Sequence, residues 1–451
     1  MPITSWGVAT KLSELTIDNA PALATRLNSV SGAEGARFCQ MFRESIDFLA
    51  QIFNQTDLTA DVAASIWNDD LMDVSFCVSI INNANLSTSK VASIFDSTNL
   101  AISKVISILE DANISADKAQ AIMYAMDNLS RLMDIITNGA SDLTVSSDTT
   151  ISDTNRYGTL TINSGVTLTL DGQPNVIICS SLVNNGILTK TLTGGAGGAA
   201  YTSPGDGGQG AGGLIIIAKN IDNNDTIQAN GENGENGGTT TTGGSGKDGT
   251  GSAIHRIGTD TVGAGGDGGY TDPDGKGEGL FGGGGGGWSG PLRKGGDGGA
   301  VTYTDYTTAS DLYTEIKKAT IDWWLANVES KSPTTTVSFP DIAGSGGGGG
   351  AEDADDLDSG GGGGSGGEII VVADSFDNTG GTIQANGANG GNGGTEGAYD
   401  AAGGGGGGGM VYCLYKTLVA SGTLSASGGS GGTGDYNGDA GTSGTAKTYA
   451  I

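Results

Sequence analysis

A six-residue motif, TIQANG, occurs twice in the chain, at residues 226–231 and 382–387. In both places an apolar segment and an Asn/Asp-rich turn precede the motif, and glycine-rich chain follows it. Each copy therefore reads as a strand, a polar turn, a second short strand and an exit into glycine. A unit repeated at such long intervals predicts an array of stacked units with large insertions between them.

Two further segments fit the same unit. Four apolar strands can be aligned, at residues 176–179, 214–217, 369–372 and 410–413. Four short strands after them also align, at residues 186–188, 226–228, 382–384 and 422–424. The first alignment places Cys179, Ile217, Val372 and Cys413 in one column, and it predicts that they stack in one core with both cysteines pointing inward and unpaired.

The cysteines are widely spaced, each among apolar neighbours: Cys39, Cys77, Cys179 and Cys413. No CxxC pair suggests a zinc site, and four cysteines in 451 residues are too few for a disulfide scaffold. Buried free thiols are therefore expected.

Residues 1–140 have a helical pattern and few glycines. Apolar residues at spacings of three and four predict an amphipathic helix through Phe38, Phe42, Ile46, Leu49 and Phe53. A 14-residue repeat follows, with Asn-Leu or Asn-Ile at positions 85, 99 and 113 and lysine at positions 90, 104 and 118.

Fourteen residues equal two heptads, so a continuous coiled coil is one interpretation of this repeat. Each repeat begins with residues that favour helix caps over helix interiors. We therefore expect short helices of about two turns, capped by residues such as Ser87 and Ser115 and stacked as a small solenoid.

The whole sequence predicts a multidomain α + β protein. After the helical domain, residues 141–193 alternate apolar residues with Thr and Ser and form the start of a β array. Residues 194–451 form a glycine-rich β-repeat domain with an insertion at about 239–367. The stacked strand units are similar to the coils of a parallel β-helix.

Most of the 84 glycines lie after residue 194, in excursions between the strand units. One interpretation is flexible linker, because glycine-rich chain normally behaves as coil. The other is ordered polyglycine in an extended helix with three residues per turn, because non-glycine residues recur at near-threefold intervals and leave two faces bare. Bare faces let neighbouring chains approach and exchange backbone hydrogen bonds.

Strand units that feed glycine tracts at residues 194–213, 387–409 and 428–434 resemble the receptor-binding adhesins at the tips of T-even-like phage long tail fibres. The resemblance covers about residues 194–446. It implies a polyglycine bundle that carries variable loops to a host surface, on the outside of a virion and in an oligomer.

The longest excursion contains a helical segment with an apolar stripe, at residues 311–329. It carries Trp323 and Trp324, and Trp288 lies earlier in the same excursion. Large amphipathic rings on an insertion predict a receptor contact. The alternative is that this helix folds back and caps the apolar end of the array, with the tryptophans as core.

Charge limits the partners. The formal net charge is −29, whereas nucleic acid and anionic membranes attract clusters of Lys and Arg. No secretory signal is visible and no apolar run reaches membrane-spanning length. We expect other virion proteins, further copies of the chain, and a host receptor or glycan as partners, with no nucleic acid and no membrane insertion.

Catalysis finds little support in the sequence. The single histidine, His255, has no recognisable nucleophile beside it and is expected to be an isolated surface residue. Two acidic runs could hold Ca²⁺ through oxygen ligands, although solvated charge is the commoner outcome. Their residues are Asp272, Asp274, Glu278, Asp353, Asp355 and Asp356. No cofactor is otherwise expected.

These observations favour a non-enzymatic structural protein of a virus particle, a fibre, spike or tail-tip component involved in host attachment. A self-assembling cell-surface or extracellular filament protein is the main alternative. A polysaccharide-degrading spike is a third, because such enzymes use paired carboxylates and acidic residues are plentiful here. The expected location is the virion surface, or the cell exterior under the alternative.

Overall fold

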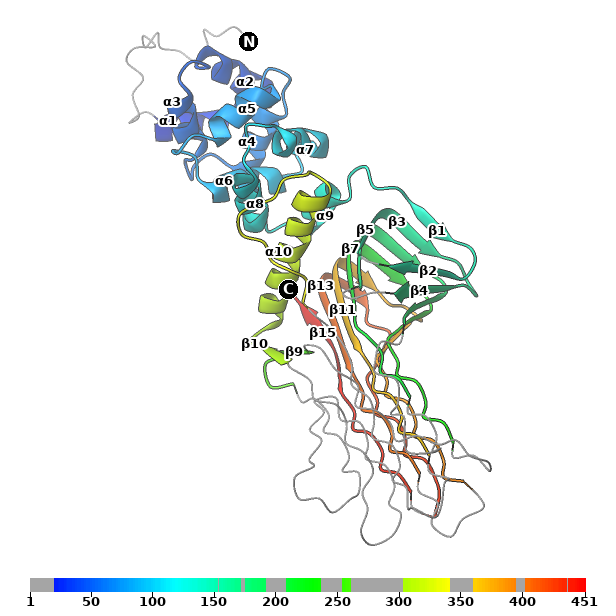
Figure 1. Ribbon diagram of the computed structural model, residues 1–451. Helices are drawn as coiled ribbons and strands as arrows, with labels where there is room; N and C mark the ends of the chain where they lie inside the picture. The colour runs from blue at the N-terminus through cyan, green and yellow to red at the C-terminus, as the bar shows by residue number, and fades with distance from the viewer. Residues whose placement is uncertain are drawn as a thin grey trace. The chain divides into compact units, whose positions relative to one another are not determined.

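The computed structural model describes the chain outside residues 1–19, 153, 172–174, 192–207, 237–253, 261–302, 341–359, 395–401 and 436. The described residues are mixed α and β, with ten helices and parallel sheets (Figure 1). They divide into two compact units. The helical unit comprises Met1–Ile136 with Lys317–Ser338, and the β unit comprises Thr137–Ile316 with Phe339–Ile451.

Short helices make up the helical unit. In chain order they are α1 Ala20–Leu27, α2 Gly32–Met41, α3 Ile46–Phe53, α4 Ala60–Trp67, α5 Val74–Ile81, α6 Thr88–Asp96, α7 Ile102–Glu110, α8 Ala116–Ala125 and α9 Leu129–Ile136. Their N-cap positions follow at a constant interval of 14 residues from α2 to α8: Ser31, Ser45, Thr59, Asp73, Ser87, Ala101 and Ser115. The prediction of short helices is confirmed, and the continuous coiled coil is wrong.

The caps explain why the chain breaks at this interval. The hydroxyls of Ser87 and Ser115 accept the backbone N–H three residues on, as predicted. One long helix through Phe38 to Phe53 was predicted, but α2 and α3 are separate. The 14-residue frame places an N-cap position at Ser45, in the middle of that apolar stripe.

Each helix packs against the helix two places further along the chain, so that α2, α4, α6 and α8 form one row and α1, α3, α5, α7 and α9 form another. Basic side chains donate hydrogen bonds to backbone carbonyls of a preceding repeat. Lys90 donates to the carbonyls of Gln55 and Leu58, and Arg131 donates to those of Phe95 and Leu100.

The excursion contributes α10 (Ala309–Asn327), and residues 317–338 belong to the helical unit. Lys331 donates to the backbone carbonyl of Leu109 in the last turn of α7 and to those of Asp111 and Ile114 after it. Lys90 and Arg131 make the same kind of contact at the ends of earlier helices in the repeat. This remote segment therefore supplies contacts that a further helical repeat would make.

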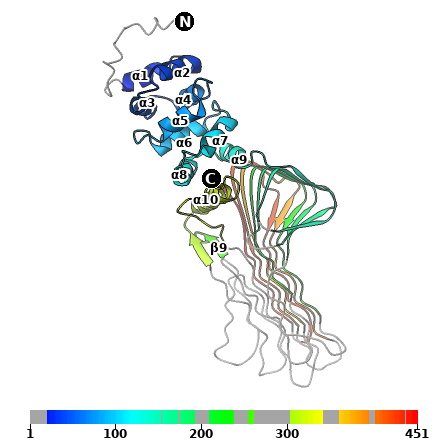
Figure 2. The same ribbon diagram turned by 45° about the horizontal axis from the view of Figure 1, so that its top comes forward.

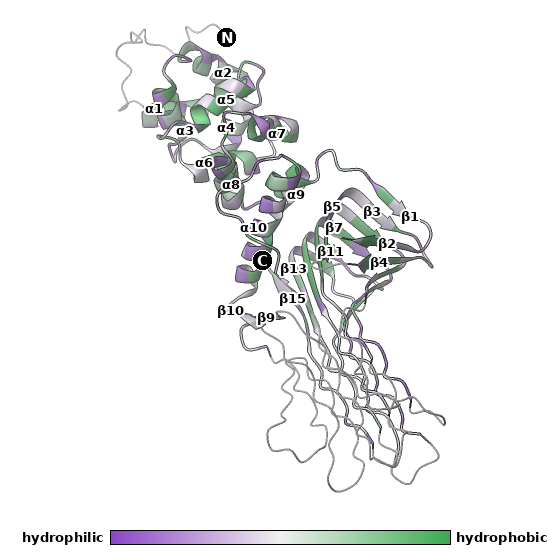
Figure 3. Cartoon of the chain, viewed as in Figure 1, coloured by the Kyte–Doolittle hydropathy of each residue, from purple (hydrophilic) through white to green (hydrophobic). Residues whose placement is uncertain are grey.

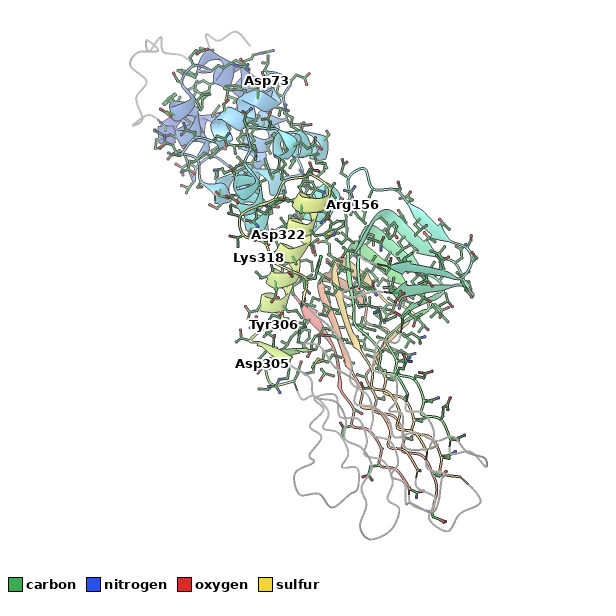
Figure 4. The ribbon with its side chains drawn as sticks, in the orientation of Figure 1. Asp73, Arg156, Asp305, Tyr306, Lys318 and Asp322 are labelled. Carbon is green, nitrogen blue, oxygen red and sulfur yellow. The ribbon has the colours of Figure 1, made fainter. Side chains whose placement is uncertain are left out.

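Asp322 of α10 also joins the segment to α8 (Figure 4). Its carboxylate accepts hydrogen bonds from Gln120 and Tyr124. The neighbouring Lys318 places its ammonium over the Tyr124 ring, 5.5 Å from the centroid.

Strands of the β unit alternate between two parallel sheets. The seven-stranded sheet contains, in spatial order, β1 Leu143–Val145, β3 Asn155–Ile162, β5 Asn175–Asn184, β7 Leu214–Asn223, β11 Glu368–Asp377, β13 Met410–Ala420 and β15 Thr445–Ala450. The six-stranded sheet contains β14 Thr423–Ser425, β12 Thr382–Gln384, β8 Thr226–Gln228, β6 Ile187–Lys190, β4 Thr167–Asp171 and β2 Thr149–Ser152. Figure 2 shows the strands of these sheets stacked side by side.

The two TIQANG copies pair in register, with Thr226 beside Thr382 and Gln228 beside Gln384. The neighbouring short strands were predicted one residue out of place. Leu188, Ile227, Ile383 and Leu424 share a column, because this register keeps an apolar residue inward on every strand.

A one-residue error also affects the cysteine column. Cys413 shares its column with Ile177, Ile216 and Val371, whereas Cys179 lies beside Ala218. Both cysteines lie in the core between the sheets and are unpaired, as predicted. Ile217 and Val372 lie outside that core cluster, because a shift of one residue along a strand reverses the face. Figure 3 shows apolar residues along these strands.

Two short parallel strands, β9 (Ile254–Ile257) and β10 (Tyr303–Tyr306), lie against the outer face of the seven-stranded sheet. His255 of β9 contacts Glu368 of β11, and Asp260 after β9 binds Lys447 and Tyr449 of β15. Both pairs belong to the β unit.

Candidate interaction surface

Within the part of the chain that the structure describes, seven glycine-rich segments leave or enter the strands and pair with one another through the backbone. We call two groups of them the glycine layers. The first layer contains residues 208–213, 360–367, 402–409 and 437–444, which lead into β7, β11, β13 and β15. The second layer contains residues 229–236, 385–394 and 426–435, which follow β8, β12 and β14.

Hydrogen bonds within the first layer recur every third residue. The N–H groups of Gly363 and Gly366 donate to the carbonyls of Gly404 and Gly407, at 2.8 and 2.9 Å. Both partners advance together along the chain, so the segments run parallel. The next segment continues the pattern, because Gly405 and Gly408 donate to Asp439 and Thr442.

Hydrogen bonds between the layers also recur every third residue, but here the two bonded segments run in opposite directions. Gly403, Gly406 and Gly409 donate to Gly391, Ala388 and Ala385 respectively. One index rises as the other falls, so the two layers run antiparallel. Each segment is thus bonded both within its own layer and to the other layer.

Glycine is required because neighbouring backbones lie where side chains would stand. A Cβ built on Gly364 would lie 2.0 Å from the carbonyl oxygen of Gln209, and one on Gly406 would lie 2.0 Å from that of Gly364. Distances this short exclude any side chain without separation of the segments. The interval of three between such positions explains the near-threefold spacing of non-glycine residues.

Asparagines stand at every third position on the outer face of the second layer. Oδ1 of Asn230, Asn233 and Asn236 accepts the backbone N–H of Asn386, Asn389 and Asn392, at 2.8–2.9 Å. Those three asparagines in turn accept the N–H groups of Ser427, Ser430 and Thr433. We call these nine residues the asparagine lattice.

The lattice completes the hydrogen bonding of the central segment. The N–H groups of residues 385–393 donate to three kinds of acceptor in turn. These are carbonyls of β14 and of the adjacent segment that follows it, carbonyls of the first layer, and the side-chain oxygens of the asparagines in residues 230–236. The asparagines therefore do what a third layer of backbone would otherwise do. This closes the outer face while leaving Asn389, Asn392, Ser430 and Thr433 exposed to solvent.

A second polar cluster lies beneath β9. His255 is 3% exposed, and its Nδ1 lies 3.4 Å from Oε2 of the fully buried Glu368. Burial raises the pKa of Glu368, opposed by the nearby His255. Burial also raises the pKa of Tyr412 on β13, reinforced by the charge of Glu368. The prediction of an isolated surface histidine is therefore wrong, because the insertion folds β9 onto the sheet.

The three tryptophans predicted to contact a receptor differ in their burial and in whether the structure describes them. Trp324 is 1% exposed in the helical unit, Trp323 is half-buried, and Trp288 lies outside the described residues. The proposed calcium ligands Asp272, Asp274, Glu278, Asp353, Asp355 and Asp356 all lie outside the described residues as well. Among the residues that are described, no group of three acidic, histidine or cysteine side chains could hold a metal ion.

Sequence reasoning missed both polar features, although one left a signal. Asparagine recurs at intervals of three after both TIQ strands, at 230, 233 and 236 and again at 386, 389 and 392. The His255–Glu368 pair left none, because its partners are 113 residues apart. Within the described ranges, no helix is both long and apolar enough to cross a membrane.

Comparison with protein-family models, with curated proteins and with solved structures finds no match for this chain.

Proposed function

We propose that the chain is a structural protein of a virus particle, a fibre, spike or tail-tip component that attaches to a host. In this proposal the alternating parallel strands form a β-helix, and the glycine layers are a polyglycine II bundle. The bundle acts as a rigid arm, with no catalytic role. The partners are other virion proteins or further copies of the chain, together with a receptor or glycan on the host.

The glycine layers carry this proposal. Ordering a glycine backbone costs about 1–2 kcal/mol per residue, so such segments hold their shape only where their backbone groups are paired. The three-residue interval of the bonds between Gly403, Gly406 and Gly409 and the second layer supports an extended threefold helix. A two-sheet base from which such segments extend suits a protein that presents a surface at a distance.

Virion association tests the proposal directly. Antibodies against the purified full-length chain should label virus particles in electron micrographs, and the purified chain should compete with those particles for host cells. Host cultures that lack virus should contain no labelled structures. Labelled filaments in such cultures, with unlabelled particles, would contradict the proposal.

One observation favours a second candidate, a filament protein that assembles from copies of itself. Among the described strands, β14 and β15 each pair on one side only, and so do β1 and β2 at the other end of the sheets. Unpaired strand edges accept further strands. Growth of filaments from the purified chain alone would favour this candidate.

A further inference from the structure

We propose that the asparagine lattice binds an extended, uncharged polysaccharide. The inference rests on the proposed attachment function and names the class of ligand. Its starting observation is that four asparagines of the lattice, Asn233, Asn236, Asn389 and Asn392, are held in place by hydrogen bonds to Oδ1. Each Oδ1 of Asn389 and Asn392 accepts a backbone N–H of the next segment, from Ser430 and Thr433.

The other side of those amides is available. Within the described part of the chain, Nδ2 of Asn389 and of Asn392 has no hydrogen-bond partner, and both residues are exposed. The same holds for Nδ2 of Asn233 and Asn236 on the neighbouring segment. An amide whose oxygen is held by the backbone and whose NH₂ group has no partner presents two donors in a fixed direction.

These donors form a regular array. Neighbouring rows are three residues apart along the chain, which is about 9 Å in an extended threefold helix. Across the segments each asparagine is tied to the next by a bond of 2.8–2.9 Å, so that the rows stay in register. Because the residues are held before a ligand arrives, binding would cost little side-chain ordering.

The chemistry of the lattice selects the ligand. It presents amides and hydroxyls with no charged side chain among its nine residues, on a chain of net charge −29. Glu232, which lies between two lattice positions, instead directs its carboxylate to the backbone N–H of Gln209 in the first layer. A polyanion would be repelled by the net charge, whereas an uncharged polysaccharide repeats hydroxyl and ring oxygens that accept from NH₂ groups along its length.

Binding to defined polysaccharides tests the inference. The full-length chain would be titrated calorimetrically with dextran, xylan and a soluble β-1,3-glucan, with alginate as the charged comparison. The test variant combines Asn389→Asp and Asn392→Asp, which keep Oδ1 as acceptor for the next segment and remove the NH₂ donors. The matched control is Asn437→Asp, because Asn437 also accepts a backbone N–H, from Gly434, but lies outside the lattice.

We expect at least one uncharged polysaccharide to bind, at least a tenfold loss of affinity in the double variant, and no change in the control. Hydrogen exchange of residues 426–435 should match the wild type in both variants, which separates lost binding from lost folding. Equal affinity in the double variant, or preference for alginate, overturns the inference. So does a change in self-association of the double variant, which would assign the lattice to contacts between copies.

The two proposals fail in different ways. A chain that labels virions and competes for host cells but binds none of these polysaccharides overturns the lattice inference and leaves the attachment function standing. A chain that binds a polysaccharide through the lattice but is absent from virions overturns the attachment function.

Discussion

Replacing Gly364 with alanine tests whether backbone contact holds the glycine layers together. Gly364 lies in the middle of the segment 360–367, its N–H donates to Glu232 and its carbonyl accepts from Ala388, both at 2.8 Å. An added Cβ would lie 2.0 Å from the carbonyl oxygen of Gln209. Non-bonded atoms normally stay about 3.5 Å apart, so the two segments must separate by roughly 1.5 Å.

That separation breaks identifiable bonds. Gly208 donates to Gly362 at 2.7 Å and Ala211 donates to Ser365 at 3.0 Å, and an added 1.5 Å or so takes both beyond hydrogen-bond range. Ala211 and Ser365 are buried, so the stranded groups find no water. At roughly 1–3 kcal/mol for each buried group left unpaired, we expect a local loss of about 2–6 kcal/mol.

Hydrogen exchange followed by mass spectrometry measures this loss where it occurs. A loss of about 2 kcal/mol or more raises the exchange rate of residues 208–213 more than tenfold. Gly380→Ala is the matched control, because Gly380 has φ +77° and nothing within 4 Å of its Cβ position. The control should cost about 1–2 kcal/mol in its own turn and leave residues 208–213 unchanged. Unchanged exchange of that segment in Gly364→Ala would refute the argument.

Three further predictions concern other parts of the chain. Lys331→Met should destabilise the helical unit by about 1.5–3 kcal/mol, because three carbonyls lose a charged donor; exchange of residues 109–114 should rise, and Lys318→Met, which removes a ring contact, should have a smaller effect. Burial raises the pKa of Glu368 above its unfolded value, so the protonated form is favoured in the fold. The contribution of protonated Glu368 to the stability of the fold is fully present below the pKa that this side chain has in the unfolded chain. That contribution is lost as the pH rises through the pKa that the side chain has in the folded chain. Thermal unfolding across a pH series should therefore show a weaker fall with pH in Glu368→Gln, and an identical profile would contradict the assignment. The four thiols should resist a disulfide reagent at pH 8 until the chain is unfolded in urea, because burial raises the pKa of each thiol; rapid reaction of the folded chain would contradict their burial.

Local patterns predicted the elements of both units well. The 14-residue repeat indicated short capped helices, since a cap residue acts on the N–H groups of its own first turn. The TIQANG pair indicated stacked strands, since alternating side chains mark one buried face. The errors in these elements concerned one helix boundary and the register of the strands. One helix was extended through Ser45, and the cysteine column was one residue out, because short patterns do not record which residue of a neighbouring segment lies opposite.

Features that join distant residues could not be predicted. Residues 317–338 belong to the helical unit although almost 200 residues separate α10 from α8 (Asp322 to Tyr124 spans 198). The burial of His255 beside Glu368 depends on where the insertion folds. The three-residue interval of glycine indicated bare faces, but the sequence left open whether those faces were covered.

The sequence by itself determined where short helices begin, which strands repeat and which glycine segments lack side chains, because caps, alternation and the absence of a Cβ act within a few residues. The tertiary structure decided how these parts are paired. Gly364 and Gln209 come into contact only because parallel strands bring their segments side by side. In the other sheet, the parallel pairing of β8 with β12 aligns Asn230 with Asn386, and it turns two repeated motifs into one continuous polar face.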